Sequence, residues 1–232
     1  MHKLLKKNVL AIIPARGGSK GVKNKNIINI HGKPLIYYTI KNAKNSKFIT
    51  DLIGSTESKK IKKIFEKYHV KVPFLRPVKL ATDKSLIIET LFFCLNQMEK
   101  INKKKYHYIV LLQPTAPNRA KNEIDICFKK IIRKKADSLM SLSLLDEPHP
   151  YKLKKISKGF VYNYLKNGKN NLNRQSLPKL YKPSGNIYIF KRKIILKKNL
   201  NTNKQTYHII KQKDFLNIDN YDDLMLAKLK LP

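Results

Sequence analysis

The chain of 232 residues contains no tryptophan, only two cysteines and few acidic side chains. Cys94 and Cys127 are too few for a disulfide framework or a cysteine zinc site, and they suit a reducing compartment, so we expect a cytoplasmic protein. No apolar run reaches the roughly 18 residues that a transmembrane helix requires. The segment Met1–Asn8 lacks the long apolar stretch and the small-residue cleavage site of a secretory signal, so we expect none.

Acidic residues are so scarce that the formal net charge is +35, from 50 Lys and Arg against 15 Asp and Glu. A charge of this size is typical of nucleic-acid-binding proteins. However, only six of the basic residues are arginine, the residue that most often makes bidentate contacts to bases. Lysine, isoleucine and asparagine share A/T-rich codons, so a biased genome would produce the same composition. We therefore expect a solvated lysine-rich surface and no nucleic-acid partner.

Short apolar runs alternate with amphipathic segments along the first 145 residues. The runs predict strands at 9–13, 49–54, 72–75, 108–112 and 139–145, and later strands at 185–190 and ending at Ile218-Asp219. The amphipathic segments predict helices at 57–68, 85–98, 123–132 and 221–229, and one that Gly32-Lys33-Pro34 opens. This order predicts an α/β fold, a three-layer, doubly wound, mainly parallel sheet with helices on both faces. Ligands bind beyond the carboxyl ends of such strands, which points to loops 14–26, 54–57, 76–85 and 113–119.

The alternation stops after residue 145. Residues 146–183 are rich in Lys, Asn, Gly and Pro, and they contain two hairpin-like stretches, 151–156 and 160–165, around Lys158-Gly159. We expect this segment to form an arm inserted into a single domain that spans residues 1–232.

The loop after the first expected strand is rich in glycine and lysine. It runs from Ala15 to Asn26 and contains Gly17, Gly18 and Gly21. Glycines permit tight turns and close approach of a ligand to backbone N–H groups, and nearby cations suit a triphosphate. The spacing is neither that of a Walker A loop nor that of the dinucleotide-binding Gly-x-Gly-x-x-Gly pattern. From these residues alone, a phosphate-binding loop and a flexible surface loop both stay open.

A longer sequence motif around this loop favours a phosphate-binding loop over a flexible surface loop. Ile12–Gly21 followed by Lys25-Asn26 resembles the signature of acylneuraminate cytidylyltransferases, the CMP-sialic acid synthetases. Further matches to this family follow in order: Gly32–Leu35, Ser55-Thr56, Arg76-Pro77, Leu80–Asp83, Leu111–Arg119, His149–Lys152, Arg174–Pro178, Pro183–Tyr188 and Ile218–Leu224. The resemblance covers about residues 8–229. It implies a nucleotide-diphospho-sugar transferase-like fold and a reaction in which CTP and an acidic nine-carbon sugar give a CMP-sugar and pyrophosphate.

The resemblance also assigns nucleotide-binding positions. It implies that Arg16 and Lys20 hold the β- and γ-phosphates, that Lys25 lies near the α-phosphate, and that Arg76 reaches the cytosine carbonyl. The other nucleotide-binding positions that it implies are Ala15, Gly17, Gly18, Asn26 and, in the base-pocket loop 81–87, Ser85.

On the sugar side, the resemblance implies that Gln113 faces the sugar and the metal region and that Thr115 binds the sugar. Lys152, Arg174 and Gln175 lie in the arm, which in this family crosses to the second subunit of a homodimer. These three residues would therefore bind the sugar in the partner's site. Gln113 also has a simpler interpretation, because a polar residue at the end of an apolar strand can satisfy backbone groups there.

The resemblance implies Mg²⁺, with Mn²⁺ as a substitute. Magnesium binds oxygen ligands, usually including one or two carboxylates. The family places two aspartates at this position, whereas this chain has Asn217 and Asp219. We expect both to hold the metal, although Asp219 equally suits a helix N-cap. With Arg16, Lys20, Lys25 and Gln113, Asp219 completes the expected catalytic set.

Several alternatives stay open at this point. The sugar could be legionaminate, pseudaminate or 3-deoxy-manno-octulosonate, although the last family's first loop differs from Gly17–Gly21. The chain could also be a degenerate enzyme that lost activity through Asn217, or a non-catalytic basic nucleic-acid-binding protein that keeps the fold. The sequence does not identify the sugar, because motif matches are thinnest in the region 146–188 that would read its substituents.

Overall fold

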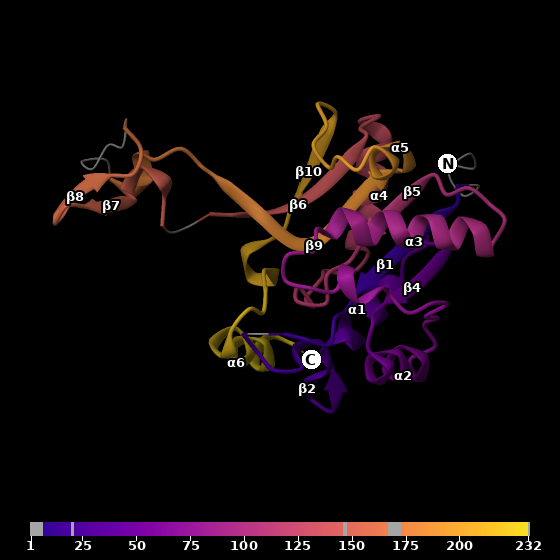
Figure 1. Cartoon of the computed structure of the whole chain (residues 1–232). Coiled ribbons are helices and arrows are strands. Elements are labelled where there is room, and N and C mark those ends of the chain that lie inside the picture. The colour runs from indigo at the N-terminus through magenta and orange to yellow at the C-terminus, as the bar shows by residue number, and fades with distance from the viewer. Residues whose placement is uncertain (1–6, 20, 146–147, 167–172, 232) are drawn as a thin grey trace.

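A computed structural model gives the chain a six-stranded sheet with helices on both faces (Figure 1). The structure describes residues 7–19, 21–145, 148–166 and 173–231. The strands run in the order β10-β6-β9-β5-β1-β4. Their bounds are β1 Val9–Pro14, β4 Asp51–Ser55, β5 Tyr108–Leu111, β6 Ser138–Leu144, β9 Tyr181–Lys191 and β10 Gln205–Ile209. Strand β1 pairs in parallel with β4 and β5, and β6 pairs in parallel with β10, whereas β9 runs antiparallel between β5 and β6.

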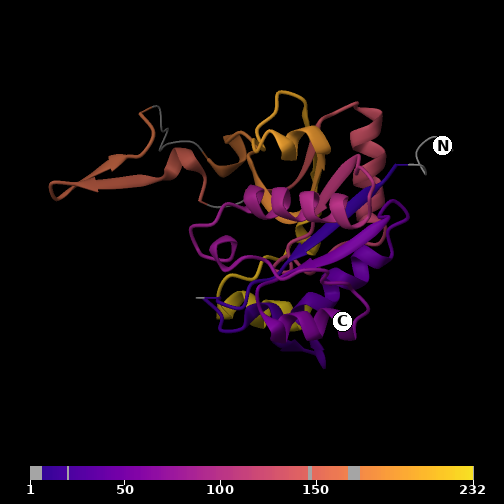
Figure 2. The ribbon, with the colours of Figure 1, turned by 45° about the vertical axis from the view of Figure 1, so that its right-hand side comes forward.

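Alternate side chains of β1 enter two separate cores, one on each face of the sheet. Val9, Ala11 and Ile13 pack in the core that contains α1 (Leu35–Lys44), α2 (Lys59–Lys67) and α4 (Glu123–Arg133). Leu10 and Ile12 pack in the core that contains α3 (Ile87–Ile101) and α5 (Arg192–Leu196). Figure 2 shows α3 lying across its face of the sheet. The expected three-layer, doubly wound, mainly parallel fold is therefore confirmed.

The last helix, α6 (Tyr221–Lys230), closes a third apolar cluster with Val22 and Leu35. Asn220 caps it and forms a capping box with Asp223. Asp219 is therefore not the N-cap, and its carboxylate lies outside the helix. None of the helices in the described part of the chain is long and apolar enough to cross a membrane.

Two of the strands predicted from the sequence do not form, so those predictions are wrong. Residues 72–75 form none, and only Lys71 makes an isolated bridge, to Ile53, because Pro73 has no N–H to donate to a ladder. No strand ends at Ile218-Asp219 either, where the Ile218 N–H instead donates to the Thr115 carbonyl at 2.8 Å. Strand β10 was not expected, since this half-exposed edge strand contains no apolar run.

The expected arm is present as a protrusion of this chain. Strands β7 (Lys154–Ser157) and β8 (Phe160–Asn163) form an antiparallel hairpin that stands away from the sheet (Figures 1 and 2). Its end is shorter than expected, because residues 181–183 already belong to β9 and pair with β6. The Leu145 N–H donates to the Leu180 carbonyl at 2.9 Å, which closes the base of the arm.

Both cysteines are buried and make no disulfide. Burial raises the pKa of the Cys94 thiol to about 11, and burial likewise raises the pKa of Cys127. Cys94 donates to the Ser55 hydroxyl at 3.4 Å. Both thiols therefore serve as core side chains.

Glu99 joins three elements at the amino-terminal end of the sheet. It accepts hydrogen bonds from Arg192 at 2.7 and 2.8 Å and from the Tyr106 N–H at 3.0 Å. Burial raises the pKa of Glu99, but hydrogen bonds from Arg192, Tyr106 and Lys105 outweigh burial and lower the pKa from 4.5 to about 2. Glu99 therefore stabilises the fold fully above pH 4.5, and this contribution is lost as the pH falls through about 2.

We expect Glu99→Gln to lower the free energy of unfolding by about 3 kcal/mol near neutral pH, following the size of the pKa shift. The difference between the wild type and the variant should shrink between pH 4.5 and about 2. Urea unfolding of both proteins across this pH range measures it. A difference that is independent of pH would contradict the prediction.

Candidate functional site

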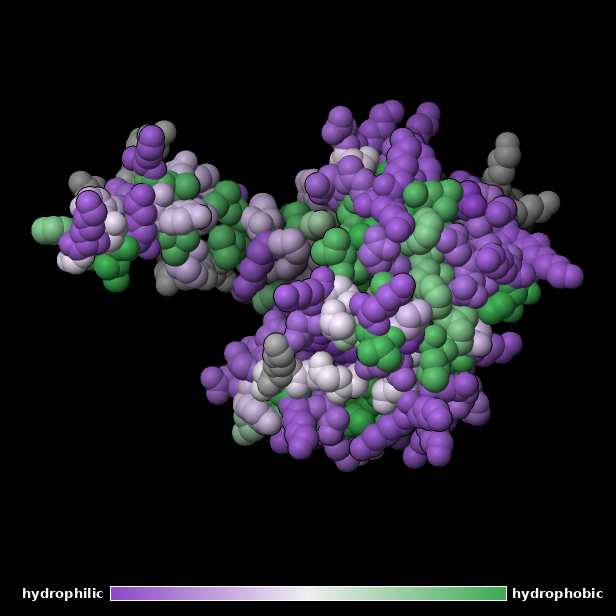
Figure 3. Space-filling model, viewed as in Figure 1, coloured by the Kyte–Doolittle hydropathy of each residue, from purple (hydrophilic) through white to green (hydrophobic). Residues whose placement is uncertain are grey.

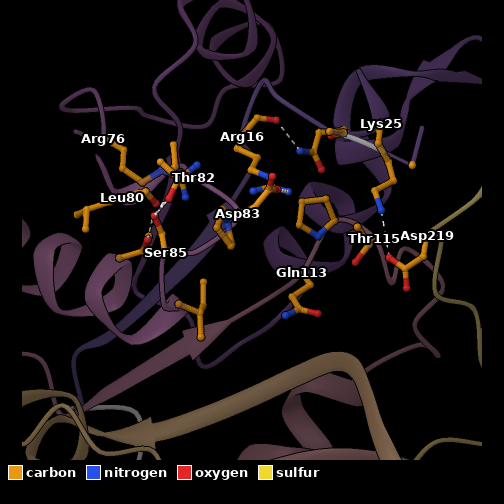
Figure 4. Close-up of a pocket in the computed structure, with 18 of the residues that line it drawn as sticks. Arg16, Lys25, Arg76, Leu80, Thr82, Asp83, Ser85, Gln113, Thr115 and Asp219 are labelled. Carbon is orange, nitrogen blue, oxygen red and sulfur yellow. Dashed lines mark hydrogen bonds and ion pairs between the residues drawn. The ribbon is translucent and has the colours of Figure 1, made fainter. Parts of the chain in front are cut away.

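A cavity of about 600 Å³ opens beyond the carboxyl ends of β1 and β5, where ligands bind in doubly wound sheets (Figure 4). Four separate segments line it. The lining residues used below are Arg16, Gly21, Lys25, Asn26, Arg76, Thr82, Asp83, Ser85, Gln113, Thr115, Asn217 and Asp219. In Figure 4 the loop with Arg76 and Ser85 lies on one side, and Lys25 and Asp219 lie on the other.

The cavity brings together most of the residues predicted from the sequence. Nine line it directly: Arg16, Lys25, Asn26, Arg76, Ser85, Gln113, Thr115, Asn217 and Asp219. Ala15, Gly17 and Gly18 belong to the same glycine-rich loop but do not line the cavity, and Lys20 lies outside the described residues. Lys152 and Gln175 are exposed on the arm and do not line the cavity of this chain. Arg174 begins a single 3₁₀ turn there (Arg174–Ser176).

The Arg16–Gly17 peptide is held at both of its polar groups. The Asn26 amide donates to the Arg16 carbonyl at 2.9 Å. The Gly17 N–H donates to Glu57 Oε1 at 2.6 Å. Because one peptide plane carries both groups, these contacts hold the orientation of the peptide that directly follows the Arg16 Cα.

An ion pair spans the mouth of the cavity. Arg16 Nη2 lies 2.5 Å from Asp83 Oδ1, in the loop expected to shape the base pocket. Within that loop the Ser85 hydroxyl donates to the Lys79 carbonyl at 2.7 Å and accepts from the Thr82 N–H at 3.1 Å. The Ser85 hydroxyl therefore holds the loop in shape, and Asp83 provides Arg16 with an anion from the chain itself.

Arg76 is the buried cation of the cavity, with only 5% of its surface exposed. Its Nη2 donates to Glu57 Oε2 at 3.0 Å, and its backbone N–H donates to the Thr56 carbonyl at 2.8 Å. Arg76 Nε is buried and has no partner. Leaving such a donor unpaired costs about 1–3 kcal/mol, so Nε suits an acceptor atom of a ligand.

The opposite wall joins the glycine-rich loop to the segment before α6. Lys25 Nζ donates to the Ile218 carbonyl at 2.7 Å and to Asp219 Oδ1 at 3.1 Å. Asn217 Nδ2 donates to Asp219 Oδ2 at 2.6 Å. Gly21 approaches this segment so closely that an added Cβ would overlap the Asp219 carbonyl oxygen. The loop and Asp219 therefore form one packed unit.

Gln113 points its side chain into the cavity beside β9. A Cβ added at Gly185, whose φ is +77°, would lie 2.7 Å from Gln113 Oε1 and 3.8 Å from Asn217 Oδ1. Glycine at this position thus leaves room for the Gln113 amide oxygen. The Gln113 backbone carbonyl accepts from Arg119 at 2.9 Å, so Arg119, and not the Gln113 side chain, satisfies the strand end.

Arg119 holds the wall behind Gln113. It donates to the Asn186 carbonyl at 3.0 and 2.8 Å and to the Thr39 hydroxyl at 3.0 Å. Complete burial lowers the pKa of Arg119 to about 9. Arg119 lies in a motif that gives it no role, and the resemblance likewise assigns no role to Glu57, which stands where many relatives have aspartate. Both act through partners distant in sequence, which no local pattern reveals.

The oxygen donors at Asp219 fit a hard divalent cation. Within the described residues, no group of three or more His, Cys, Asp or Glu side chains could hold a metal. The site offers one carboxylate, 67% exposed, and the amide oxygens of Asn217 and Gln113. Mg²⁺ is commonly held by one or two carboxylates together with substrate phosphates, so the donor set suits it when a nucleotide is bound.

Comparisons with known proteins agree with this geometry. A family model described as cytidylyltransferase matches residues 10–225. The chain is 36% identical over 198 residues to post-translational flagellin modification protein B of Campylobacter coli, covering 85% of this chain and 83% of that one. It is 30% identical over 227 residues to pseudaminic acid cytidylyltransferase of Campylobacter jejuni subsp. jejuni serotype O:23/36, covering 95% and 94%. It is 31% identical over 220 residues to N-acylneuraminate cytidylyltransferase of Streptococcus agalactiae serotype III, covering 93% of this chain and 51% of the longer relative.

Solved structures share the architecture. The structure of CMP:2-keto-3-deoxy-manno-octonic acid synthetase complexed with CTP superposes with a TM-score of 0.68. The two sequences are 12% identical, and the match covers 96% of this chain and 98% of that one, so it supports the fold alone. The family model spans nearly the whole chain, and relatives that share at least 30% identity align over most of it. The chain therefore belongs to the cytidylyltransferase family and is a CTP-dependent nucleotidyltransferase.

Proposed function

We propose that this enzyme transfers CMP from CTP to the anomeric hydroxyl of a sialic-acid-type nonulosonic acid. The hydroxyl oxygen attacks the α-phosphorus and the bond to the β-phosphate breaks. Pyrophosphate leaves and the hydroxyl proton is released. The cavity carries this proposal, because both cations and oxygen donors line it. The names of relatives that act on pseudaminic acid, N,N'-diacetyllegionaminic acid and N-acylneuraminate support an acidic nine-carbon acceptor.

Electrostatic positioning supplies most of the catalysis in phosphoryl and nucleotidyl transfer. Arg16 is the candidate for the triphosphate, which would replace Asp83 as its anion. Arg76 offers its unpaired Nε to the cytosine carbonyl. Lys25 uses two of its three donors on the Ile218 carbonyl and Asp219, which leaves one for the α-phosphate.

Mg²⁺ is the proposed cofactor, with Mn²⁺ as a substitute. Asp219, Asn217 and the Gln113 amide oxygen would hold it together with the nucleotide phosphates. When bound, the cation would neutralise the charge that develops on the leaving pyrophosphate. Lys25 and Asn217 keep the Asp219 carboxylate oriented toward this place.

We further propose that the arm joins two copies of the chain. Its hairpin exposes large apolar side chains to solvent, including 81% of Ile156, 66% of Phe160 and 67% of Val161 (Figure 3). Large apolar side chains that are exposed on both faces of a protruding hairpin are typical of a surface that another chain covers. In such a homodimer, Lys152, Arg174 and Gln175 would reach the sugar carboxylate in the partner's cavity.

Pyrophosphate release with a panel of acceptors tests the proposed function. The purified enzyme, CTP and Mg²⁺ should release pyrophosphate with at least one of N-acetylneuraminic, legionaminic and pseudaminic acids, and release with 3-deoxy-manno-octulosonic acid alone would instead support the eight-carbon alternative. Mass spectrometry should identify the matching CMP-sugar. A mixture with CTP but no sugar is the control. The absence of release with every acid would overturn the proposal.

A further inference from the structure

We infer that Glu57 is a positioning residue that sets the relative placement of the two arginines in the nucleotide site. Glu57 lies directly after β4 and does not line the cavity. It acts through Arg16 and Arg76, which do. This inference rests on the proposed function, because it takes the cavity to be the CTP site.

The two carboxylate oxygens of Glu57 serve different partners. Oε1 accepts from the Gly17 N–H at 2.6 Å, and Oε2 accepts from Arg76 Nη2 at 3.0 Å. The first contact fixes the peptide from which Arg16 projects, and the second fixes the guanidinium of Arg76. One side chain thus joins the glycine-rich loop to the segment after residue 75.

Burial makes both contacts strong. The Glu57 side chain is 17% exposed and that of Arg76 is 5% exposed. Hydrogen bonds to an ionised carboxylate are about twice as strong as neutral ones, and little solvent reaches this pair to screen it. Glu57 also provides the buried guanidinium with a counter-charge while Nε keeps no partner. The Arg76 guanidinium is therefore held through Nη2, and its Nε–H suits an acceptor atom of a ligand.

Neighbouring contacts do not replace Glu57. The Asn26 amide holds the carbonyl of the Arg16–Gly17 peptide but not its N–H. The Arg76 backbone is held by Thr56, which leaves its side chain dependent on Glu57. Without the Glu57 carboxylate, the glycine-rich loop loses its contact at the Gly17 N–H and Arg76 loses its contact at Nη2. No shared side chain would then join the loop to the Arg76 guanidinium.

Glu57→Gln tests this positioning role, because it removes the charge while the side chain keeps nearly the same volume. Glutamine has one acceptor oxygen and an NH₂ group, so it can accept from Gly17 or from Arg76 but turns a donor toward the other. We expect the Kd for CTP, measured by calorimetry with Mg²⁺ and no sugar, to rise about 10-fold, as for other residues that orient binding groups. The preference for CTP over UTP should fall as well, because the cation that reads the base is misplaced.

The matched control is Glu66→Gln, the same change at an exposed glutamate of α2 that pairs with Lys62. It should bind CTP within about two-fold of the wild type, as expected for a surface charge. Glu57→Asp keeps the charge but is too short to reach both partners, and it should weaken CTP binding at least about three-fold. If Glu57→Gln does not fold, CTP binding by Glu57→Asp tests the same role of Glu57.

The possible results distinguish the role of Glu57 from the proposed transfer of CMP to a sugar acid. Unchanged CTP affinity and unchanged CTP/UTP preference in the Glu57 variants would overturn the role of Glu57. A purely structural role would lower the melting temperature without changing the nucleotide preference, which also overturns it. A wild-type chain that binds CTP but transfers CMP to no acid overturns the proposed function and leaves the role of Glu57 standing. A wild-type chain that binds neither nucleotide overturns both.

Discussion

Replacing Gly21 with alanine should lower kcat/KM for CTP by about 100-fold, because a shift of about 1 Å in a catalytic group has an effect of this size. The added methyl group would overlap the Asp219 carbonyl oxygen. A backbone carbonyl cannot rotate away as a flexible side chain can. Either the glycine-rich loop or the segment 217–219 must move, and Lys25 and Asp219 would then separate.

Lys63→Ala, at an exposed position of α2, is the control for Gly21→Ala. It should keep activity within a few-fold of the wild type. Overpacking of about 1–3 kcal/mol should also lower the melting temperature of Gly21→Ala by several degrees. Steady-state pyrophosphate release measures the main effect. If Gly21→Ala remained as active as Lys63→Ala, the close approach would not matter to the reaction.

Replacing Arg119 with methionine should destabilise the fold by about 3–5 kcal/mol. Methionine fills much of the same volume but removes four hydrogen bonds to the carbonyls of Asn186 and Gln113 and to the Thr39 hydroxyl. Buried acceptors that lose a charged donor each cost about 1–3 kcal/mol. Part of this loss is offset, because the desolvated guanidinium charge is removed with the side chain.

Urea unfolding and thermal melting should show the destabilisation by Arg119→Met as a fall of about 10 °C in the melting temperature. Arg119→Lys should recover only part of it, because an ammonium cannot reproduce the planar fork. Arg133→Met, at the exposed end of α4, is the control and should change stability by less than about 0.5 kcal/mol. An unchanged urea midpoint for Arg119→Met would show that the carbonyls are satisfied without it.

The sequence predicts the parts of the fold that local patterns determine. The apolar runs of β1 and β5 and the periodicity of α2 and α4 identify these elements to within a few residues. Strand β10 escapes prediction because an exposed edge strand needs no apolar run. Residues 72–75 were misassigned because β-branched and aromatic content outweighed the effect of Pro73.

The residues of the site likewise divide into those that local motifs predict and those that only the folded structure reveals. Arg16, Lys25 and Arg76 belong to ordered motifs, and the structure places all three on one cavity. Glu57 follows the Ser55-Thr56 motif, which gives it no role, and its contacts with the Gly17 N–H and the Arg76 guanidinium are seen only in the fold. Contacts between residues 19 and 40 positions apart are set by tertiary packing. The catalytic and binding roles stay predictions until the variants are measured.

Strand β9 gives the arm a mechanical connection to the cavity. Its first residues leave the base of the arm, pair with β6, and reach Gly185 beside the Gln113 side chain without an intervening loop. The register of the ladder with β6 shifts between Met140 and Leu142, opposite this part of β9, so Gly185 lies where the pairing is interrupted. A displacement of the arm would therefore reach the cavity wall at the part of β9 that the ladder holds least.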